Sequence, residues 1–374
     1  MRIHGLRLAQ KAFLASRRNP LPSALLTQWQ DIVVARHAQR RALTRDDRDW
    51  IKNEVRWAFE HFQESDTLHA GPEEHSRQQS LFREACERLS KGEPLAYVLG
   101  SQPFGDLPFD LSVRAPVLIP RPETEQWALK LADQLRNFVA GRPTEALDIR
   151  VLDICTGSGC IAILLSHCLR QLRSKHQHLR WKVLGLDVSP IAVDLARTNA
   201  TRLGPLSDDA SLDFYQADVF SDTDMTAVFQ SIFGPDVFET RQDPCSPKPI
   251  NIIVSNPPYI RPDAYRDQLE SSVRDWEDFR ALVGVHPSTA EVVNSALKQD
   301  DEAGLTFYRR IRSLVGALPW MHQRRLALPR FVLEIGQGQA EAVTSIFSDL
   351  SGTTTIQIQV HKDAWGVERT VEIY

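Results

Sequence analysis

The sequence predicts an α/β protein with a mostly parallel sheet, covered by helices on both faces and preceded by a small all-helical region. After Arg150, apolar runs of strand length alternate with helical patterns, as in a parallel sheet. A glycine-rich turn, Thr156–Gly159, stands where the first of these strands meets its helix. Asn256-Pro257-Pro258-Tyr259 comes at the end of the strand Asn251–Val254. In open α/β sheets ligands bind at the carboxyl ends of the strands, so both motifs are expected at one ligand site.

Bulk composition excludes several classes of protein. The 374 residues are enough for two domains, and 42% hydrophobic and 25% charged residues are typical of a globular chain. No apolar run is long enough to cross a membrane. A net charge of −4 disfavours stable binding to nucleic acid by bulk electrostatics. The five cysteines form no Cys-x-x-Cys pair, so we expect reduced thiols and no metal site.

The first thirty residues carry basic side chains and no acidic one before Asp31. The cations are Arg2, Arg7, Lys11, Arg17 and Arg18. Apolar residues interleave with them, a pattern typical of a mitochondrial transit segment. We expect a mitochondrial matrix location, with the first helix of a cytoplasmic protein as the alternative.

From Leu25 to Leu89 the chain has helical periodicity. Its apolar positions at three- and four-residue spacing are Trp50, Ile51, Val55, Trp57, Ala58, Phe59 and Phe62, then Leu81, Phe82, Ala85 and Leu89. Thr44, followed by Asp46 and Asp47, is expected to cap the helix that contains Trp50. Ser65–Gln79 is predicted to be a loop. We delimit a helical domain at residues 1–92.

Residues 93–120 are predicted to form a β-hairpin linker, because Leu107, Phe109, Leu111 and Val113 alternate with polar residues. A second domain, which contains the alternating strands and helices, is expected at residues 121–374. It should begin with the helix Pro122–Val139.

The expected elements of this domain follow in order along the chain. The strands are Val151–Ile154, Trp181–Leu186, Asp213–Gln216, Asn251–Val254 and Phe331–Glu334, with a terminal antiparallel hairpin of Thr355–His361 and Arg369–Tyr374. The helices are Cys160–Leu172, Pro190–Leu203, Leu305–Leu318 and Gln339–Leu350. An acidic loop follows the third strand. Residues 234–249 and 284–301 are predicted to be surface insertions.

Acidic residues stand at the carboxyl ends of three successive strands. Asp153 precedes the glycine turn, whose Gly157 and Gly159 let the backbone approach a ligand. A dinucleotide site would share these glycines, but the Asp153 carboxylate would repel a pyrophosphate and favours a cationic sulfonium, an amine or a water shell. Asp187 can accept both hydroxyls of a ribose, and Asp218 is placed near an adenine amine.

The Asn256–Tyr259 corner suits a planar NH2 group. The Asn256 side-chain oxygen can accept one N–H, and the carbonyls around Pro257 and Pro258 can accept another. Tyr259 can stack on the planar group. The group is either the amide of a glutamine or the exocyclic amine of a base.

With these motifs, the chain resembles the release factor glutamine methyltransferases, within the class I S-adenosylmethionine-dependent methyltransferases. The resemblance covers Leu89 to Tyr374. Besides the glycine turn, Asp187 and the corner, it rests on Gly92-Glu93-Pro94-Leu95-Ala96-Tyr97, Leu118-Ile119-Pro120-Arg121-Pro122-Glu123-Thr124-Glu125, Leu333-Glu334-Ile335-Gly336 and Glu368-Arg369. Cys155 replaces the usual glycine before Thr156, and Trp365-Gly366-Val367 replaces a more typical turn.

The resemblance implies a Rossmann-like class I methyltransferase fold and transfer of a methyl group from S-adenosylmethionine to the glutamine of a Gly-Gly-Gln motif in a peptide-chain release factor. The implied catalytic residues are Asn256, Pro257 and Tyr259. The implied cofactor-binding residues are Asp153, Cys155, Thr156, Gly157, Ser158, Gly159, Asp187, Asp218, Val219 and Asn256. The implied substrate-binding residues are Asn256, Pro257, Pro258, Tyr259, Arg121, Thr124 and Glu125. The helical domain is expected to dock the release factor, and the protein to be a monomer.

Two other functions fit parts of this pattern. An adenine-N6 DNA or RNA methyltransferase would offer the same corner to adenine, but would carry a basic groove or an added recognition domain. A non-catalytic partner subunit would keep the fold, although Asn256 and Asp187 are intact. A nicotinamide oxidoreductase would need a proton relay that the sequence does not show.

Overall fold

The computed structural model describes residues 23–64, 72–238, 250–285, 303–316, 318, 327–348, 350 and 356–374. Residue contacts divide the chain into two compact units. The first contains residues up to Pro103 together with Val113–Ala115 and Glu270–Trp276, and the second contains Phe104–Ser112, Pro116–Leu269 and Glu277–Tyr374. The basic stretch before residue 23 and most of both predicted insertions lie outside the described residues. Within the described ranges, no helix has the length and apolar character to cross a membrane.

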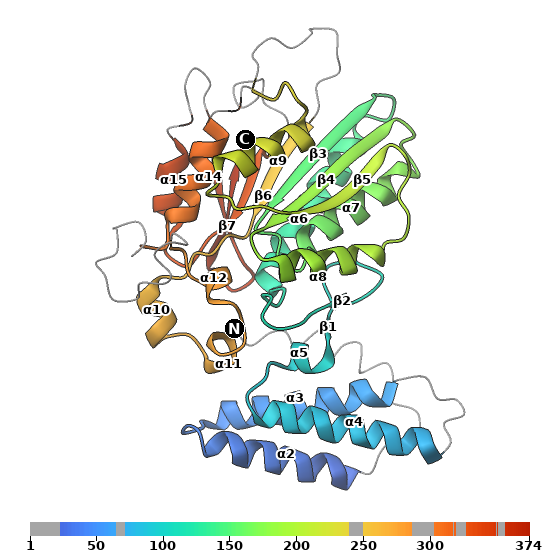
Figure 1. Cartoon of the computed structure of the whole chain (residues 1–374), viewed down its shortest axis with the longest axis vertical. Coiled ribbons are helices and arrows are strands. Elements are labelled where there is room, and N and C mark those ends of the chain that lie inside the picture. Colours follow the sequence, from blue (N-terminus) through green and yellow to red (C-terminus); the bar gives the residue numbers. More distant parts are fainter. Residues whose placement is uncertain are drawn as a thin grey trace. The chain divides into compact units, whose positions relative to one another are not determined.

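The first unit is helical, as the periodicity predicts. Its helices are α2 (Ser23–Ala38), α3 (Arg45–Glu64), α4 (Pro72–Ser90), α5 (Leu95–Leu99) and α11 (Ser271–Arg274), and the short strand β1 (Ser101–Gln102) follows α5 (Figure 1). Val33, Val55 and Phe82 are fully buried in its core. Thr44 caps α3 reciprocally: its Oγ1 accepts the Asp47 N–H at 3.2 Å, and Asp47 Oδ2 accepts the Thr44 N–H at 2.9 Å. The predicted cap is confirmed.

Two predictions about this unit are wrong. The predicted loop over 65–79 ends early, because α4 already begins at Pro72. Proline has a backbone preset for the first helical position, which makes it a start signal as much as a breaker. Leu81 is 37% exposed, although its spacing predicts burial. The apolar face of α4 is instead formed by Phe82, Ala85, Cys86 and Leu89.

The second unit is built on a seven-stranded sheet in the order β5-β4-β3-β6-β7-β9-β8. The strands are β3 (Leu147–Ile154), β4 (Leu179–Asp187), β5 (Ala210–Gln216), β6 (Ile250–Ser255), β7 (Phe331–Glu334), β8 (Ile358–Lys362) and β9 (Glu368–Ile373). β5, β4, β3, β6 and β7 pair in parallel, whereas β9 pairs antiparallel with β7 and with β8. The predicted parallel sheet with a terminal antiparallel hairpin at one edge is confirmed.

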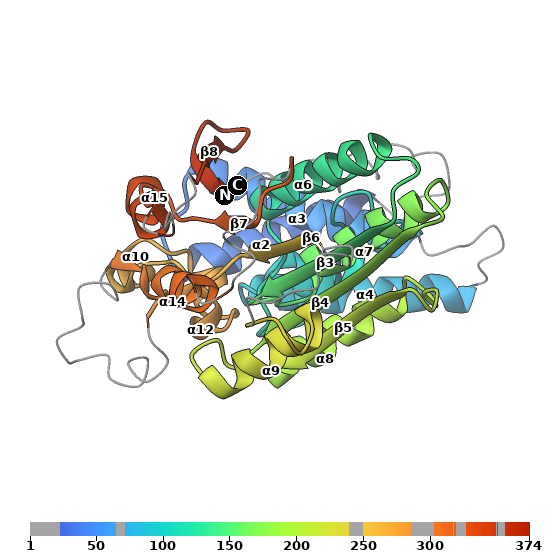
Figure 2. The ribbon, with the colours of Figure 1, turned by 90° about the horizontal axis from the view of Figure 1, so that it is seen from above.

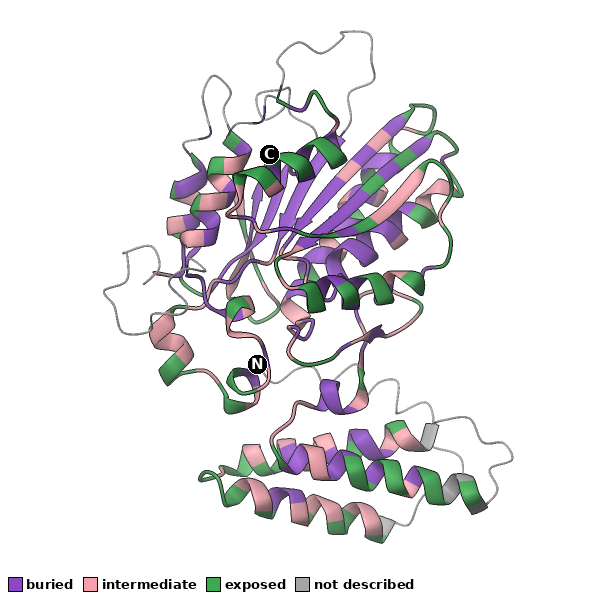
Figure 3. Ribbon diagram, viewed as in Figure 1, coloured by how far each residue is buried: buried purple, intermediate pink, exposed green. Residues whose placement is uncertain are grey.

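Helices cover both faces of this sheet (Figures 1 and 2). The core of one face contains residues of α6 (Pro122–Ala140), α7 (Cys160–Arg173) and α8 (Pro190–Thr201). The core of the other contains residues of α9 (Asp222–Phe233), α14 (Thr306–Gly316) and α15 (Ala340–Ser348). β3 contributes Val151 to the first core and Leu152 to the second, and Figure 3 shows the central strands as largely buried. Two short helices, α10 (Pro262–Asp267) and α12 (Phe279–Leu282), follow β6.

The predicted acidic loop after β5 is wrong, because the segment forms α9. The Ser221 hydroxyl accepts the Asp224 N–H at 3.2 Å, which caps the helix, and Asp222 and Asp224 lie in its first turn. The buried positions are Met225, Val228, Phe229, Ile232 and Phe233, which have helical spacing. The acidic residues therefore mark a helix start.

The predicted strand over 107–113 is reduced to β2 (Leu111–Ser112). The main-chain groups of Ser112 are bound by the side chain of Asn199. Asn199 Oδ1 accepts the Ser112 N–H at 2.7 Å, and Asn199 Nδ2 donates to the Ser112 carbonyl at 3.0 Å. The buried Asn199 amide thus satisfies the main-chain N–H and carbonyl of Ser112, which would otherwise need a partner strand.

The strand order reverses direction between β3 and β6. From β3 the chain proceeds outward through β4 to β5, then returns to place β6 on the other side of β3. Such a switch point opens a crevice at the carboxyl ends of the two central strands, where open α/β sheets bind ligands.

Candidate active site

A polar residue stands at the carboxyl end of each parallel strand. Asp153 lies near the end of β3 and Asp187 ends β4, while Asp218 comes two residues after β5. Asn256 follows β6, and Glu334 ends β7. The first four are among the site residues predicted from the sequence. Glu334 was noted only as part of a family motif.

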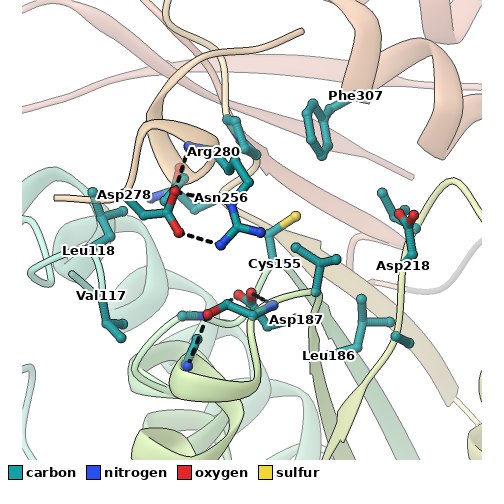
Figure 4. Close-up of a pocket in the computed structure, with 18 of the residues that line it drawn as sticks. Val117, Leu118, Cys155, Leu186, Asp187, Asp218, Asn256, Asp278, Arg280 and Phe307 are labelled. Atoms are coloured by element: carbon teal, nitrogen blue, oxygen red, sulfur yellow. Dashed lines mark hydrogen bonds and ion pairs between the residues drawn. The ribbon is translucent and has the colours of Figure 1, made fainter. Parts of the chain in front are cut away.

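A pocket lies at this edge of the sheet (Figure 4). The predicted site residues that line it are Cys155, Gly157, Asp187, Asp218, Val219, Asn256 and Pro258. They come from the loops after β3, β4, β5 and β6, so the switch point brings together segments that are far apart in the chain. Asp153, Thr156, Ser158, Gly159, Pro257, Tyr259, Arg121, Thr124 and Glu125 are not among the lining residues.

The glycine turn after β3 has an unusual backbone. Gly157 and Gly159 have φ of 56° and 80°, and Cys155 has φ of 62°. A Cβ at Gly157 would meet no atom within 4 Å, which leaves the backbone open to a ligand, whereas one at Gly159 would lie 3.0 Å from the Ala196 Cβ. Gly157 therefore serves close approach to the pocket, and Gly159 serves packing of α7 against α8.

Asp187 is held by main-chain donors on both carboxylate oxygens. Its Oδ2 accepts the Gly157 N–H at 2.9 Å and its Oδ1 accepts the Ser189 N–H at 2.9 Å. Burial raises the pKa of Asp187, while these two donors lower it. Each oxygen keeps a lone pair for a further donor.

Asp153 is fully buried behind this turn. Its Oδ2 accepts the Thr156 hydroxyl proton at 2.6 Å, whereas Oδ1 has no hydrogen-bond partner among the described residues. Burial raises the pKa of Asp153 from its ordinary value of 3.8 to about 7. A buried carboxyl oxygen without a donor fits a site that a cation or a polar ligand completes.

The Asp218 side of the pocket combines a carboxylate with aromatic rings. Asp218 Oδ1 accepts the Phe220 N–H at 2.9 Å. The rings of Phe220 and Phe307, both lining the pocket, meet edge to face with centroids 5.0 Å apart. This end of the pocket suits a flat, apolar-faced ligand with a polar edge.

Asn256 lies on the opposite side of the glycine turn from Asp218 (Figure 4). Ser255 Oγ donates to the Ile154 carbonyl at 2.7 Å, which joins the end of β6 to that of β3. Asn256 Nδ2 donates to Thr124 Oγ1 at 3.1 Å, while its Oδ1 has no partner among the described residues. The amide thus has one end fixed to α6 and an acceptor left over at the pocket.

Tyr259, Thr124, Glu125 and Arg121, which directly precedes α6, lie outside the lining of the pocket. The Tyr259 hydroxyl donates to Glu334 Oε1 at 3.1 Å. Arg121 forms a buried ion pair with Glu277, with Nη2 to Oε2 at 2.6 Å. Thr124 is buried, and Glu125 is partly exposed. Of these residues Thr124 has a hydrogen bond to Asn256, and none of them lines the pocket.

Several residues that line the pocket were not predicted from the sequence. They are Pro116, Val117, Leu118, Phe220, Asp278, Arg280 and Phe307. Asp278 Oδ2 accepts from Arg280 Nη2 at 2.7 Å, and Figure 4 shows the Arg280 side chain in the pocket. The sequence signal of Asp278 and Arg280 is weak, because α12 is only four residues long and shows no periodicity.

An open parallel sheet with this switch-point site and an antiparallel terminal hairpin defines a class I methyltransferase fold. No family model matches the chain. The chain is 29% identical over 291 residues to "Probable MRF1 mitochondrial N(5)-glutamine methyltransferase mtq1" of Schizosaccharomyces pombe, covering 77% of each chain. It is 30% identical over 264 residues to "Release factor glutamine methyltransferase" of Bacillus anthracis, covering 71% of each. A solved structure of the hMettl16 catalytic domain aligns with a TM-score of 0.39 and 15% identity over 70% of this chain and 74% of that one.

The chain belongs to the release factor glutamine methyltransferase family, and it is an enzyme. The predicted family and the predicted fold class are confirmed.

Proposed function

We propose that this enzyme transfers a methyl group from S-adenosylmethionine to the side-chain nitrogen of the glutamine in a release factor's Gly-Gly-Gln motif. The observation that carries the proposal is Asn256, whose amide nitrogen is bound to Thr124 and whose Oδ1 remains an acceptor at the pocket, next to the glycine turn. The names of the relatives support the same reaction.

The residues of the pocket fit the cofactor part by part. Asp187 would accept the ribose hydroxyls, because both of its oxygens keep lone pairs. Asp218, Val219 and the Phe220–Phe307 pair would hold the adenine. The turn Cys155–Gly159, with Asp153 behind it, would hold the methionine portion. Arg280 has a suitable charge for the cofactor's carboxylate.

When bound, S-adenosylmethionine supplies a sulfonium methyl group, whose bond to sulfur breaks with the electron pair staying on the neutral thioether. The protein must present the amide nitrogen, which is a poor nucleophile because its lone pair is delocalised. Asn256 Oδ1 and the Pro257 carbonyl would accept its two N–H groups and so fix its position. The new N–C bond leaves a positive nitrogen that loses one proton to solvent. Positioning and fixed dipoles, without a strong base, would supply most of the acceleration.

The experiment is mass spectrometry of a release factor incubated with the enzyme and S-adenosylmethionine. We expect the Gly-Gly-Gln peptide to gain the mass of one methylene with wild-type enzyme and not with Asn256→Ala. Calorimetry with S-adenosylhomocysteine provides the control, because Asn256 also lines the pocket and a loss of cofactor affinity must be told apart from a loss of methyl transfer. Methylation of nucleic acid alone would establish an adenine methyltransferase instead. Absence of cofactor binding to the wild type would favour a non-catalytic subunit.

We further propose that the protein acts in the mitochondrial matrix as a monomer and that residues 1–92 dock the release factor. The Arg-rich start of the chain and the mitochondrial names of two relatives support this location. Imaging of the full chain with a C-terminal fluorescent tag tests it. A signal excluded from mitochondria would contradict the proposal.

A further inference from the structure

Glu334 is a buried carboxylate that the reaction as described does not use. It is 1% exposed, at the end of β7. Its Oε2 accepts from Thr124 Oγ1 at 2.6 Å and from Trp127 Nε1 at 2.8 Å, and its Oε1 accepts from the Tyr259 hydroxyl at 3.1 Å. Among the described residues no cation forms an ion pair with it. A buried carboxylate without a countercharge is costly to keep.

The two arginines whose charges act on the neighbouring Tyr259 are paired with other carboxylates. Arg121 pairs with Glu277 at 2.6 Å, and Arg369 pairs with Asp363 at 3.3 Å. Glu334 is therefore held by hydrogen bonds from neutral donors. Burial raises the pKa of Glu334, while Thr124, Trp127 and Tyr259 lower it.

The donors and acceptors around Glu334 fix the orientation of the Asn256 amide. The Trp127 indole N–H can only donate, so Glu334 Oε2 is an acceptor. Thr124 has a single hydroxyl proton, and it donates that proton to the same oxygen. The Thr124 oxygen can then only accept from Asn256, which places Nδ2 on the Thr124 side and leaves Oδ1 for the pocket.

We propose that Glu334 is a positioning residue that holds both ends of the Asn256–Tyr259 corner. Through Thr124 it orients the Asn256 amide so that an acceptor faces the incoming N–H, and through the Tyr259 hydroxyl it holds the ring that follows the two prolines. The inference rests on the proposed function, because it assigns Asn256 Oδ1 to the substrate amide. The carboxylate contacts neither cofactor nor substrate and acts through its neighbours.

The decisive variant is Thr124→Val, which keeps the shape of the side chain and removes its hydroxyl. Asn256 Nδ2 then loses its partner, and the amide is free to turn its NH2 toward the pocket. We expect kcat for release factor methylation to fall about 10- to 100-fold, with KM and the affinity for S-adenosylhomocysteine unchanged within about threefold. Thr124→Ser keeps a hydroxyl and should restore kcat to within a few-fold of the wild type.

Tyr308→Phe is a matched control for loss of buried polar contacts. The Tyr308 hydroxyl is fully buried and donates to the main-chain carbonyl of Glu334 at 2.9 Å, away from the carboxylate. This variant should lose stability like Thr124→Val and keep kcat. Equal losses of kcat in both would show a general packing effect and overturn the proposal.

Substitution of Glu334 itself separates orientation from charge. In Glu334→Gln the amide oxygen can still accept from Trp127 and Thr124, while the NH2 donates to Tyr259, so most of kcat should remain. In Glu334→Leu all three contacts are lost, and kcat should fall at least as far as in Thr124→Val. A glutamine variant as inactive as the leucine variant would assign Glu334 a charge role and overturn positioning. If the wild type fails to methylate a release factor, that result contradicts the proposed function itself, whereas the comparison of variants tests only the role of Glu334.

Discussion

In the cofactor side of the pocket, Asp187 accepts the N–H of Ser189, two residues away, and that of Gly157, 30 residues away. In the corner, Asn256 donates to Thr124, 132 residues away, and Thr124 donates to Glu334, 210 residues away. One half of the site is therefore built from strand ends and their own main chain. The other half depends on side chains from α6 and β7 meeting across the fold.

The backbones of the two halves differ as well. The glycine turn uses positive φ at Cys155, Gly157 and Gly159. The corner instead uses Pro257 and Pro258, whose φ is preset by the ring. The comparison teaches that binding of the cofactor and orientation of the acceptor are separate properties, which substitutions can remove one at a time.

The largest expected effect is on cofactor affinity in Asp187→Ala. The variant removes the carboxylate that orders Gly157 and Ser189 and that would accept the ribose hydroxyls. Hydrogen bonds to a charged group contribute about 1.5–3 kcal/mol each, so losing the bonds to two hydroxyls should raise the Kd for S-adenosylhomocysteine at least about 100-fold. Isothermal titration calorimetry measures it. If Asn256→Ala weakens binding equally, the two halves are not separable.

A smaller effect is expected on the pH dependence of stability in Asp153→Asn. The pKa of Asp153 is raised to about 7 when folded, so the folded state retains a proton that the unfolded state releases above its ordinary value of 3.8. The unfolding free energy of the wild type should therefore fall as pH rises toward 7 and level off above it. Asparagine cannot titrate, so its stability relative to the wild type should increase by about 2 kcal/mol between pH 5 and pH 7.

Urea denaturation without cofactor measures this difference. Other buried acids with raised pKa values, such as Glu54, are present in both proteins and cancel in the subtraction. A difference that does not change with pH would show that Asp153 is ionised in the folded protein throughout this range.

The same contrast explains what the sequence could predict. Asp187 ends a strand that its apolar run reveals, Asp218 closely follows the next strand, and Gly157 stands in a turn between a strand and a helix, so local pattern is sufficient. Arg280 lies in a four-residue helix without periodicity. The role of Glu334 depends on its contacts with Thr124 and Trp127, which form only when β7 packs near α6. No local pattern encodes a contact across 210 residues. The fold was predicted well for the same reason, except at three places. At α9 and α4 acidic residues and a proline are helix starts as well as loop signals, and the alternating segment over 107–113 forms only the short strand β2.

The smallest expected effect tests the strained backbone of the glycine turn. At most positions alanine is more stable than glycine, because glycine loses more backbone freedom on folding. Cys155 has φ of 62°, where a Cβ lies close to the neighbouring carbonyl at a cost of about 1–2 kcal/mol. Cys155→Ala keeps that strain and Cys155→Gly removes it. The usual order of stability should therefore be reversed, with the glycine variant more stable than the alanine variant by about 0.5–1 kcal/mol. Both variants lack the thiol, so its packing cancels when their urea midpoints are compared. An alanine variant that is the more stable of the two would mean that the backbone at residue 155 is not in the left-handed region, and the glycine turn would then lose its distinction from the proline corner.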